Sequence, residues 1–363
     1  MNPQSLVLTE TRIKWLLKGY FVFVLLELFL LGSGQLIRYH ALTLRMVNFV
    51  LLTGFCMVFF RKVNIKGEYL VMLYIFLSSL LLSGLIGFFN GASFSAIFND
   101  VKPLLFFIYL IPFSLLIKTR TDIERIIKII KISALILASL YFLYLTLFLM
   151  YPIIRFGLSL LEINGEIFFR ANGPFFFYKG FFFIMISIFL INQRTIMDKV
   201  TLFILLLAIL LTMTRGLYLA LATPFLFLGF INLISSKKIK LSTLFTLIAF
   251  LILAGIFLPI ILQWIGNKSA SDAIRIAAIN NVNEAITPLS LVMGHGFGVT
   301  AGVNRVHLEI SYYEILHKQG IIGLLVWLIP LIYCFRKLVR DQTEKLDKRF
   351  FFSRSFCLHY FSD

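Results

Sequence analysis

VTLFILLLAILLTMTRGLYLALATPFLFLGFINLI, residues 200–234, is the stretch of this sequence that decides the fold. Its only charged residue is Arg215, in the TMTRG segment Thr212–Gly216. A helix of about 20 apolar residues crosses a bilayer, and this run is nearly twice that length. The chain must therefore fold back, and TMTRG is the only break available. The stretch predicts two membrane-spanning helices joined by a tight hairpin with Arg215 at its tip.

The rest of the chain has the same character. It is 363 residues long, 60% hydrophobic and 14% charged, which excludes a soluble domain. Apolar runs of membrane-spanning length recur along it. We predict an all-α integral membrane protein with about ten transmembrane helices, forming a single polytopic membrane domain over residues 1–363. The predicted spans lie near 15–32, 41–60, 68–89, 104–117, 132–151, 175–191, 200–214, 217–234, 241–262 and 320–335.

The distribution of cations gives the orientation in the membrane. The net charge is +17, and the excess Lys and Arg lie in short loops between spans, an arrangement that records topology and disfavours a nucleic-acid partner. With a cytoplasmic N-terminus, the positive-inside rule puts every cation-rich loop and the tail 336–363 on the inner side. The two larger loops, about 152–174 and 263–319, then face outward, so the chain carries one long loop on the outer side.

Cysteines and acids give no sign of a metal centre. Cys56, Cys334 and Cys357 lack CxxC spacing, which indicates neither a disulfide framework nor a zinc site. The chain also has no Asp-x-Asp pair of the kind that holds a metal with a nucleotide-sugar. We expect no metal and no cofactor.

Two arginines on the outer side are candidates for ligand binding. Arg170 lies in EIFFRANGPFFFYKG (Glu166–Gly180), beside an Asn-Gly-Pro turn at the mouth of a span. It is either an interfacial anchor that snorkels to lipid phosphates or a ligand for an anionic substrate. Arg215 is the stronger candidate, because a cation held near hydrocarbon is costly and usually functional.

The long outer loop carries two further motifs. GHGFG (Gly294–Gly298) is either a simple turn or part of a ligand site, and it lacks the context of a nucleotide fingerprint. HLEISYYEILHKQGIIG (His307–Gly323) is richer in chemistry. As a helix it would carry His307, Ser311 and Glu314 on one stripe, and Glu309, Tyr312, Tyr313 and Leu316 on another. The alternative is a surface helix with ordinary polar residues.

The first half of the chain suggests structure rather than chemistry. TDIERIIKIIK (Thr121–Lys131) has a Thr cap, early acids and an apolar stripe, which predict a short amphipathic helix on the inner surface. Asp100 and Lys102 belong to an outer loop, where we expect a solvated turn rather than a ligand contact. Glu27 and Arg45 are the charges that fall within predicted spans.

The order of these features resembles the O-antigen polymerase and O-antigen ligase superfamily of bacterial envelope glycosyltransferases. The resemblance covers residues 165–335, and SYYEILHKQGIIG (Ser311–Gly323) is its strongest part. Counting back from Gly320 and Gly323, the His-Asn pair typical of the family falls on Glu309–Ile310, whereas this chain has His307 two residues earlier. The position of the catalytic base therefore stays open between them.

The resemblance implies a metal-independent glycosyltransferase with an undecaprenyl-diphosphate-linked donor, in the bacterial inner membrane with its site on the periplasmic side. Such an enzyme needs cations for the leaving diphosphate and a base for the acceptor hydroxyl. The implied partners are the lipid-linked oligosaccharide, membrane lipids, and a chain-length regulator and flippase of the same pathway. The implied residues are Arg170, Arg215, Arg305 and Arg275 for the diphosphate, His307, Glu309 and Glu314 for the base, and Tyr312 and Tyr313 for the sugar.

Three functions remain open at this point. A polymerase joins lipid-linked repeat units, whereas a ligase transfers the finished polysaccharide to lipid A core, and motifs alone hardly separate the two. A polysaccharide-lipid flippase is the alternative from another class. Flippases carry charges within their spans along a pathway. Here the spans carry few, and polar residues gather in outer loops, so the sequence favours an enzyme over a flippase or other transporter. Of the two enzymes we predict the polymerase.

Overall fold

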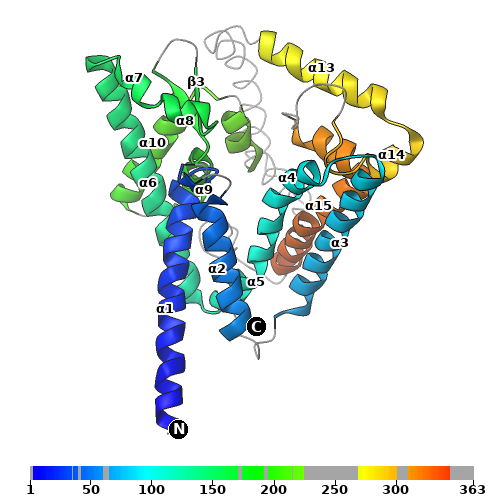
Figure 1. The fold of residues 1–363 in the computed structure, drawn as a ribbon. Coiled ribbons are helices and arrows are strands. Elements are labelled where there is room, and N and C mark those ends of the chain that lie inside the picture. Colours follow the sequence, from blue (N-terminus) through cyan, green and yellow to red (C-terminus); the bar gives the residue numbers. More distant parts are fainter. Residues whose placement is uncertain are drawn as a thin grey trace. The chain divides into compact units, whose positions relative to one another are not determined.

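The computed structural model describes residues 3–34, 36–39, 42–59, 65–170, 174–191, 195–214, 216–224, 269–300 and 310–343. These residues form two compact units (Figure 1). The described residues within 1–50 and 119–267 belong to unit 1, and those within 51–118 and 268–347 belong to unit 2.

Unit 1 is built from long helices and one β-hairpin that packs against them. Helices α1 and α10 both contact α6, and α9 packs on both α6 and α10. The elements are α1 (Pro3–Leu30), β1 (Arg38–Tyr39), β2 (Leu42–Thr43), the start of α2 (Leu44–Phe59), α6 (Arg120–Met150), α7 (Ile154–Gly157), α8 (Ser159–Ile163), β3 (Ile167–Phe169), β4 (Phe176–Tyr178), α9 (Phe181–Leu190) and α10 (Ile196–Leu211).

Helix α6 differs from the sequence prediction. Residues 121–131 are not a separate surface helix but the first turns of one continuous helix. The helix begins at a capping box, in which Thr119 and Asp122 each bond the other's backbone N–H, so the cap is Thr119, two residues before the predicted Thr121. No Gly or Pro separates Lys131 from the apolar run that follows, so the helix continues without a break.

The core of unit 1 lies where the β3–β4 hairpin meets the helices. Strands β3 and β4 are antiparallel, with Ile167 opposite Tyr178 and Phe169 opposite Phe176. The ring of Phe176 packs edge-on against Tyr141 of α6 at 4.9 Å between centroids. Ile167, Phe176 and Tyr178 are all buried, so one face of the hairpin belongs to the core. The predicted span 175–191 is accordingly shorter, because its first residues form β4.

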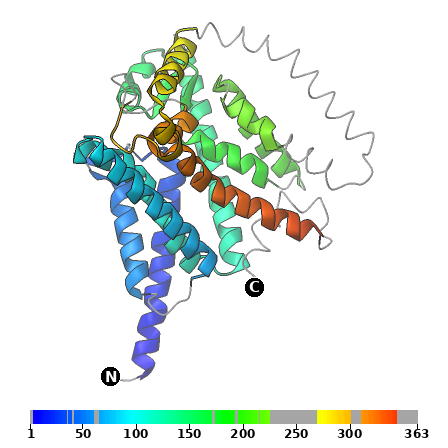
Figure 2. The same cartoon turned by 90° about the vertical axis from the view of Figure 1, so that its right-hand side faces the viewer.

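Unit 2 contains helices from both ends of its sequence. Helix α15 packs against α3 and α14, and Figures 1 and 2 both show α14 beside α15. The elements are α3 (Gly67–Phe89), α4 (Phe94–Leu104), the 3-10 helix η1 (Leu105–Tyr109), α5 (Leu110–Leu116), α13 (Ser269–Ala285), α14 (Pro288–Met293) and α15 (Ser311–Thr343). Helix α15 is kinked at Gly320, whose φ is +65°.

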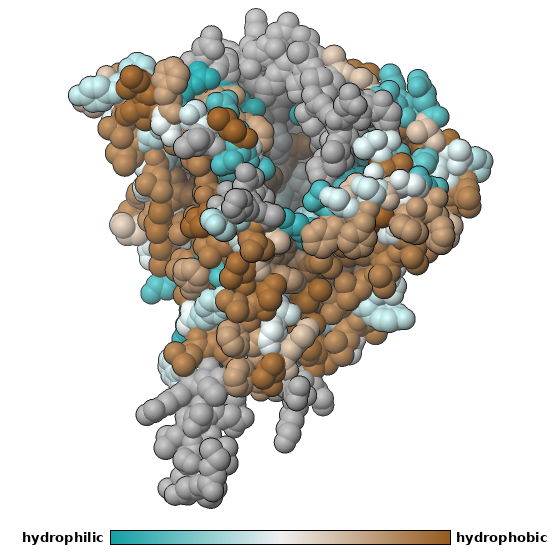
Figure 3. Space-filling view, viewed as in Figure 1, coloured by the Kyte–Doolittle hydropathy of each residue, from teal (hydrophilic) through white to brown (hydrophobic). Residues whose placement is uncertain are grey.

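The membrane character is confirmed in its general form. Four described segments are long and apolar enough to cross a bilayer: Gly67–Phe89, Phe94–Leu116, Arg120–Met150 and Ser311–Lys337. Large hydrophobic side chains are exposed on α2, α3 and α6, and hydrophobic residues cover much of the face shown in Figure 3. The total of about ten spans remains a prediction, since span 241–262 and most of 217–234 lie outside the described residues.

Candidate functional site

The first candidate site in unit 1 joins the β3–β4 hairpin to the turn that follows α10. Arg170 is half-buried at the end of β3, and its backbone N–H donates to the Phe175 carbonyl at 2.8 Å. Its guanidinium Nη2 donates to the Thr214 hydroxyl at 2.9 Å. The structure therefore brings Arg170 to the residue that precedes Arg215 in the chain. Arg215 itself and residues 171–173 lie outside the described residues.

The turn that holds Thr214 is tightly built. Met213 has φ +48°, a left-handed conformation that is uncommon for a residue other than glycine. Side chains satisfy the last carbonyls of α10: Tyr141 donates to Leu211 O at 3.0 Å, and Thr214 donates to Thr212 O at 3.1 Å. Thr212 is fully buried. The hydroxyl that Arg170 contacts is thus oriented by its own bond to the Thr212 carbonyl.

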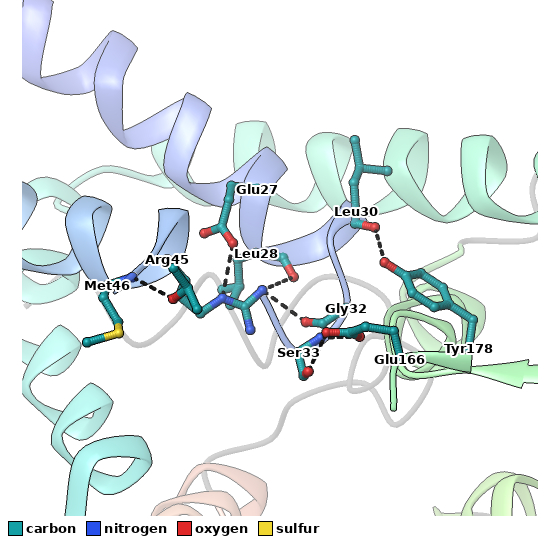
Figure 4. Close-up of polar contacts among 10 residues, drawn as sticks. Glu27, Leu28, Leu30, Gly32, Ser33, Arg45, Met46, Glu166 and Tyr178 are labelled. Carbon is teal, nitrogen blue, oxygen red and sulfur yellow. Dashed lines mark hydrogen bonds and ion pairs between the residues drawn. The ribbon is translucent and has the colours of Figure 1, made fainter. Parts of the chain in front are cut away.

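At its other end the hairpin is bonded to the end of α1 (Figure 4). Glu166 is fully buried, and its carboxylate accepts from the Ser33 backbone N–H at 3.0 Å and from the Ser33 hydroxyl at 2.5 Å. Tyr178 donates its hydroxyl to Leu30 O at 2.7 Å. Burial, and then the neighbouring Glu166 carboxylate, raises the pKa of Tyr178 above its ordinary value, so the phenol stays protonated and remains a donor.

The two charges predicted within spans pair with each other. Arg45 Nε lies 3.1 Å from Glu27 Oε1, and both side chains are largely buried. The Arg45 guanidinium also donates to Gly32 O at 2.9 Å, close to the C-terminus of α1 (Figure 4). A cation is stabilised at that end of a helix by the unsatisfied carbonyls there. The ion pair and the bonds to the end of α1 together offset the cost of burying these two charges within apolar helices.

In unit 2 the GHGFG turn is a packing element and not a free anion-binding loop. Each of its backbone N–H groups already donates within the protein. Gly294 donates to Ser290 O, His295 to His317 O, Gly296 to Lys318 O and Phe297 to Ser83 O, while Gly298 donates to the Asp100 carboxylate at 2.7 Å. A phosphate cradle needs such groups directed at the ligand. Of the two readings left open by the sequence, the structure favours the simple turn.

Asp100 corrects the expectation of a solvated turn. Its side chain is only 2% exposed and lies 2.8 Å from Nζ of the buried Lys318. Lys318 Nζ also lies 2.8 Å from Oε1 of Glu314, whose side chain is 23% exposed. The carboxylate is buried because it binds the Gly298 N–H and the Lys318 cation together. Both partners are about 200 residues away in the sequence, so no local signal marks Asp100.

The remaining candidates have different surroundings. Tyr312 is exposed and Tyr313 half-buried at the start of α15, on the turn that carries Glu314. Arg275 is exposed on α13. His307, Glu309 and Arg305 lie outside the described residues. Sequence reasoning did not single out His295 and His317, whose rings stack at 4.5 Å between centroids.

One comparison with known proteins identifies the family. An O-antigen polymerase of Shigella flexneri is 30% identical to this chain over 332 residues, which cover 88% of this chain and 82% of that protein. No family model matches the chain. No solved structure matches it either. The match extends far beyond the motifs of residues 165–335 and confirms the resemblance that they indicate. The chain belongs to the O-antigen polymerase family.

Proposed function

We propose that this protein is an O-antigen polymerase that joins undecaprenyl-diphosphate-linked repeat units at the periplasmic face of the bacterial inner membrane. The name of the Shigella flexneri relative supports polysaccharide polymerisation, and the apolar helices supply the membrane setting. The observation that carries the proposal is the Arg170–Thr214 bond, which holds a guanidinium against the turn leading into Arg215.

The proposed reaction is a direct displacement at the anomeric carbon of the donor sugar. The acceptor hydroxyl oxygen forms the new bond to that carbon, and the bond from the carbon to the diphosphate oxygen breaks. The electron pair leaves with undecaprenyl diphosphate, and a base takes the hydroxyl proton. Arg170 and Arg215 stabilise the leaving charge, because guanidinium stays ionised and contacts phosphate oxygens with two N–H groups. No step requires a metal ion.

The other proposed roles come from the long loop. One of His307, Glu309 and Glu314 is the base, and Tyr312 and Tyr313 are sugar contacts with exposed or half-exposed rings. Arg305 and Arg275 are further diphosphate ligands. Glu314 Oε1 lies 2.8 Å from Lys318 Nζ. A chain-length regulator and a flippase are the proposed partners in the pathway.

A strain that lacks this protein tests the proposal. A polymerase predicts surface lipid A core that carries one repeat unit and nothing longer, because the first unit is still attached without it. Complete loss of attached polysaccharide would identify a ligase instead. Accumulation of lipid-linked units on the cytoplasmic side, with none at the outer face, would identify a flippase.

A further inference from the structure

The β3–β4 hairpin of unit 1 is fixed at one end and carries Arg170 at the other. Glu166 immediately precedes β3, and Tyr178 is the last residue of β4. Because Ile167 pairs with Tyr178, the Glu166–Ser33 and Tyr178–Leu30 bonds lie at the same end of the hairpin. Arg170 pairs with Phe175 at the opposite end. The end of α1 therefore holds the base of the hairpin, and the base constrains the position of Arg170 at the other end of β3.

The hairpin is short enough to transmit this constraint. Only Ile167, Phe168 and Phe169 separate Glu166 from Arg170, which is about 13 Å at the rise of an extended strand. The core face of the hairpin is packed through Ile167, Phe176 and Tyr178, so the strands cannot tilt into the core. A rotation about the base remains the movement that would carry the Arg170 guanidinium away from Thr214, and the two bonds at the base oppose it.

The contact at the base is specific for a carboxylate. Ser33 offers a backbone N–H and a hydroxyl, and each oxygen of Glu166 accepts one of them. The preceding residue, Gly32, has φ +57°, and a Cβ there would lie 2.5 Å from Glu166 Oε2 and 2.9 Å from the Tyr178 hydroxyl. The backbone thus turns so that Glu166 can approach. Burying a carboxylate costs desolvation free energy, and an apolar side chain could fill the same space without that cost.

We propose that Glu166 is a positioning residue: together with Ser33 it fixes the hairpin so that Arg170 stays on the Thr214 turn, where the donor diphosphate binds. This inference rests on the proposed function, in which Arg170 stabilises the leaving group. Glu166 itself touches neither substrate nor reacting atoms. It acts on the reaction only through the placement of Arg170.

A double-mutant cycle on the full-length protein in lipid tests this role. The probe is the lipid-linked repeat unit, and kcat and KM for chain extension are measured. Ser33→Ala removes one of the two bonds and leaves the backbone N–H, so kcat should fall about tenfold. Glu166→Ala removes both and should approach the loss caused by Arg170→Ala. In the Arg170→Ala background, adding Ser33→Ala should cause no further loss of kcat, because the guanidinium that the Ser33–Glu166 contact positions is already absent.

Two variants keep the cycle interpretable. The kinetics of Glu166→Ala are interpreted only if the variant protein reaches the membrane in normal amount. If it does not, the test rests on Ser33→Ala. Lys18→Ala is the matched control, since it breaks the 3.0 Å pair between Lys18 of α1 and Asp122 of α6 and leaves the hairpin untouched. It should leave kcat within about twofold in both backgrounds.

The outcomes separate this inference from the proposed function. An equal loss from Ser33→Ala with and without Arg170 would show a general structural role and overturn the positioning role alone. An unchanged kcat in Ser33→Ala would also overturn the positioning role alone. Full activity in Arg170→Ala would overturn the role of Arg170 in the proposed function, and the positioning of that residue with it.

Discussion

At the scale of single residues, the proposed catalysis depends on how Arg170 is held. Arg170 is half-buried, and its guanidinium donates to the Thr214 hydroxyl, which itself donates to the Thr212 carbonyl. A fixed donor stabilises a developing charge better than a mobile one, because no reorganisation is needed during the reaction. Lysine keeps the charge but loses the planar two-pronged contact. The two side chains can therefore be distinguished by experiment.

We expect Arg170→Lys and Arg215→Lys to lose most polymerising activity and the corresponding Ala variants nearly all of it. The cost is roughly 2–4 kcal/mol in the barrier for each arginine, by analogy with the loss of one preorganised donor. Chain extension per amount of inserted protein is the measurement. Arg155, whose guanidinium lies over the Phe169 ring at 4.7 Å, is the control and should tolerate Ala. Long chains from a normally inserted Arg215→Ala protein would reduce that arginine to a membrane anchor.

The base is a second question at this scale. If His307 takes the proton, His307→Ala should abolish chain extension while Glu309→Ala keeps appreciable activity. If the register of the family's His-Asn pair holds instead, the order of the two variants reverses. Glu314→Gln retains the geometry opposite Lys318 and loses only the charge, so it tests the third candidate. Normal activity in all three variants at normal protein levels would remove the loop from the proton transfer.

At the scale of elements, the GHGFG turn packs backbone against backbone. A Cβ on Gly296 would lie 2.0 Å from the Gly87 nitrogen in α3, and one on Gly320 would lie 2.3 Å from the Val292 carbonyl. Phe297 of the same turn joins the buried cluster of Phe76 and Leu80. The glycines therefore serve the close approach of α3, α14 and α15.

We predict that Gly296→Ala lowers the stability of the protein by about 3 kcal/mol, since α3 must move to admit the methyl group. Thermal unfolding in detergent measures the change. Gly91→Ala is the matched control, because Gly91 has a similar φ of +81° but nothing within 4 Å of its Cβ position. It should cost only the roughly 1–2 kcal/mol of the left-handed backbone. Equal effects of the two substitutions would contradict the packing role.

Apolar length and charge predicted the helical elements well, and long-range contacts explain most of what they missed. The spans 68–89 and 132–151 follow directly from runs of the required length. The hairpin of β3 and β4 was missed because its strands have three residues each and share aromatic side chains with the span that follows. Asp100 and Glu166 were missed because their burial depends on partners more than 100 residues away. Arg170 was selected as a candidate from its local turn motif, and its role in catalysis stays a prediction.

At the scale of the whole molecule, the described part of each unit contains a buried ion pair of its own. Glu27 pairs with Arg45 in unit 1, and Asp100 pairs with Lys318 in unit 2. The excess cations that give the net charge of +17 lie mostly in predicted inner loops. This asymmetry predicts an orientation with the N-terminus in the cytoplasm.

Reporter fusions along the chain test that orientation. Fusions in the cation-rich loops should report the cytoplasm, and fusions in the two large loops should report the periplasm. A cytoplasmic signal from the long loop would put the proposed chemistry in the wrong compartment. The cytoplasmic positions are after Lys66, Arg120, Lys238 and Arg340, and the periplasmic positions are near Asn164 and Asn281.

The most direct test of the central claim is a reaction with the purified protein in lipid and undecaprenyl-diphosphate-linked repeat units as its sole substrate. The account predicts lipid-linked chains of increasing length and release of undecaprenyl diphosphate, with no need for lipid A core. It also predicts that Arg170→Ala slows the formation of both products by roughly 30- to 1,000-fold. Failure to lengthen the units, together with transfer of preformed chains once lipid A core is added, would contradict the account.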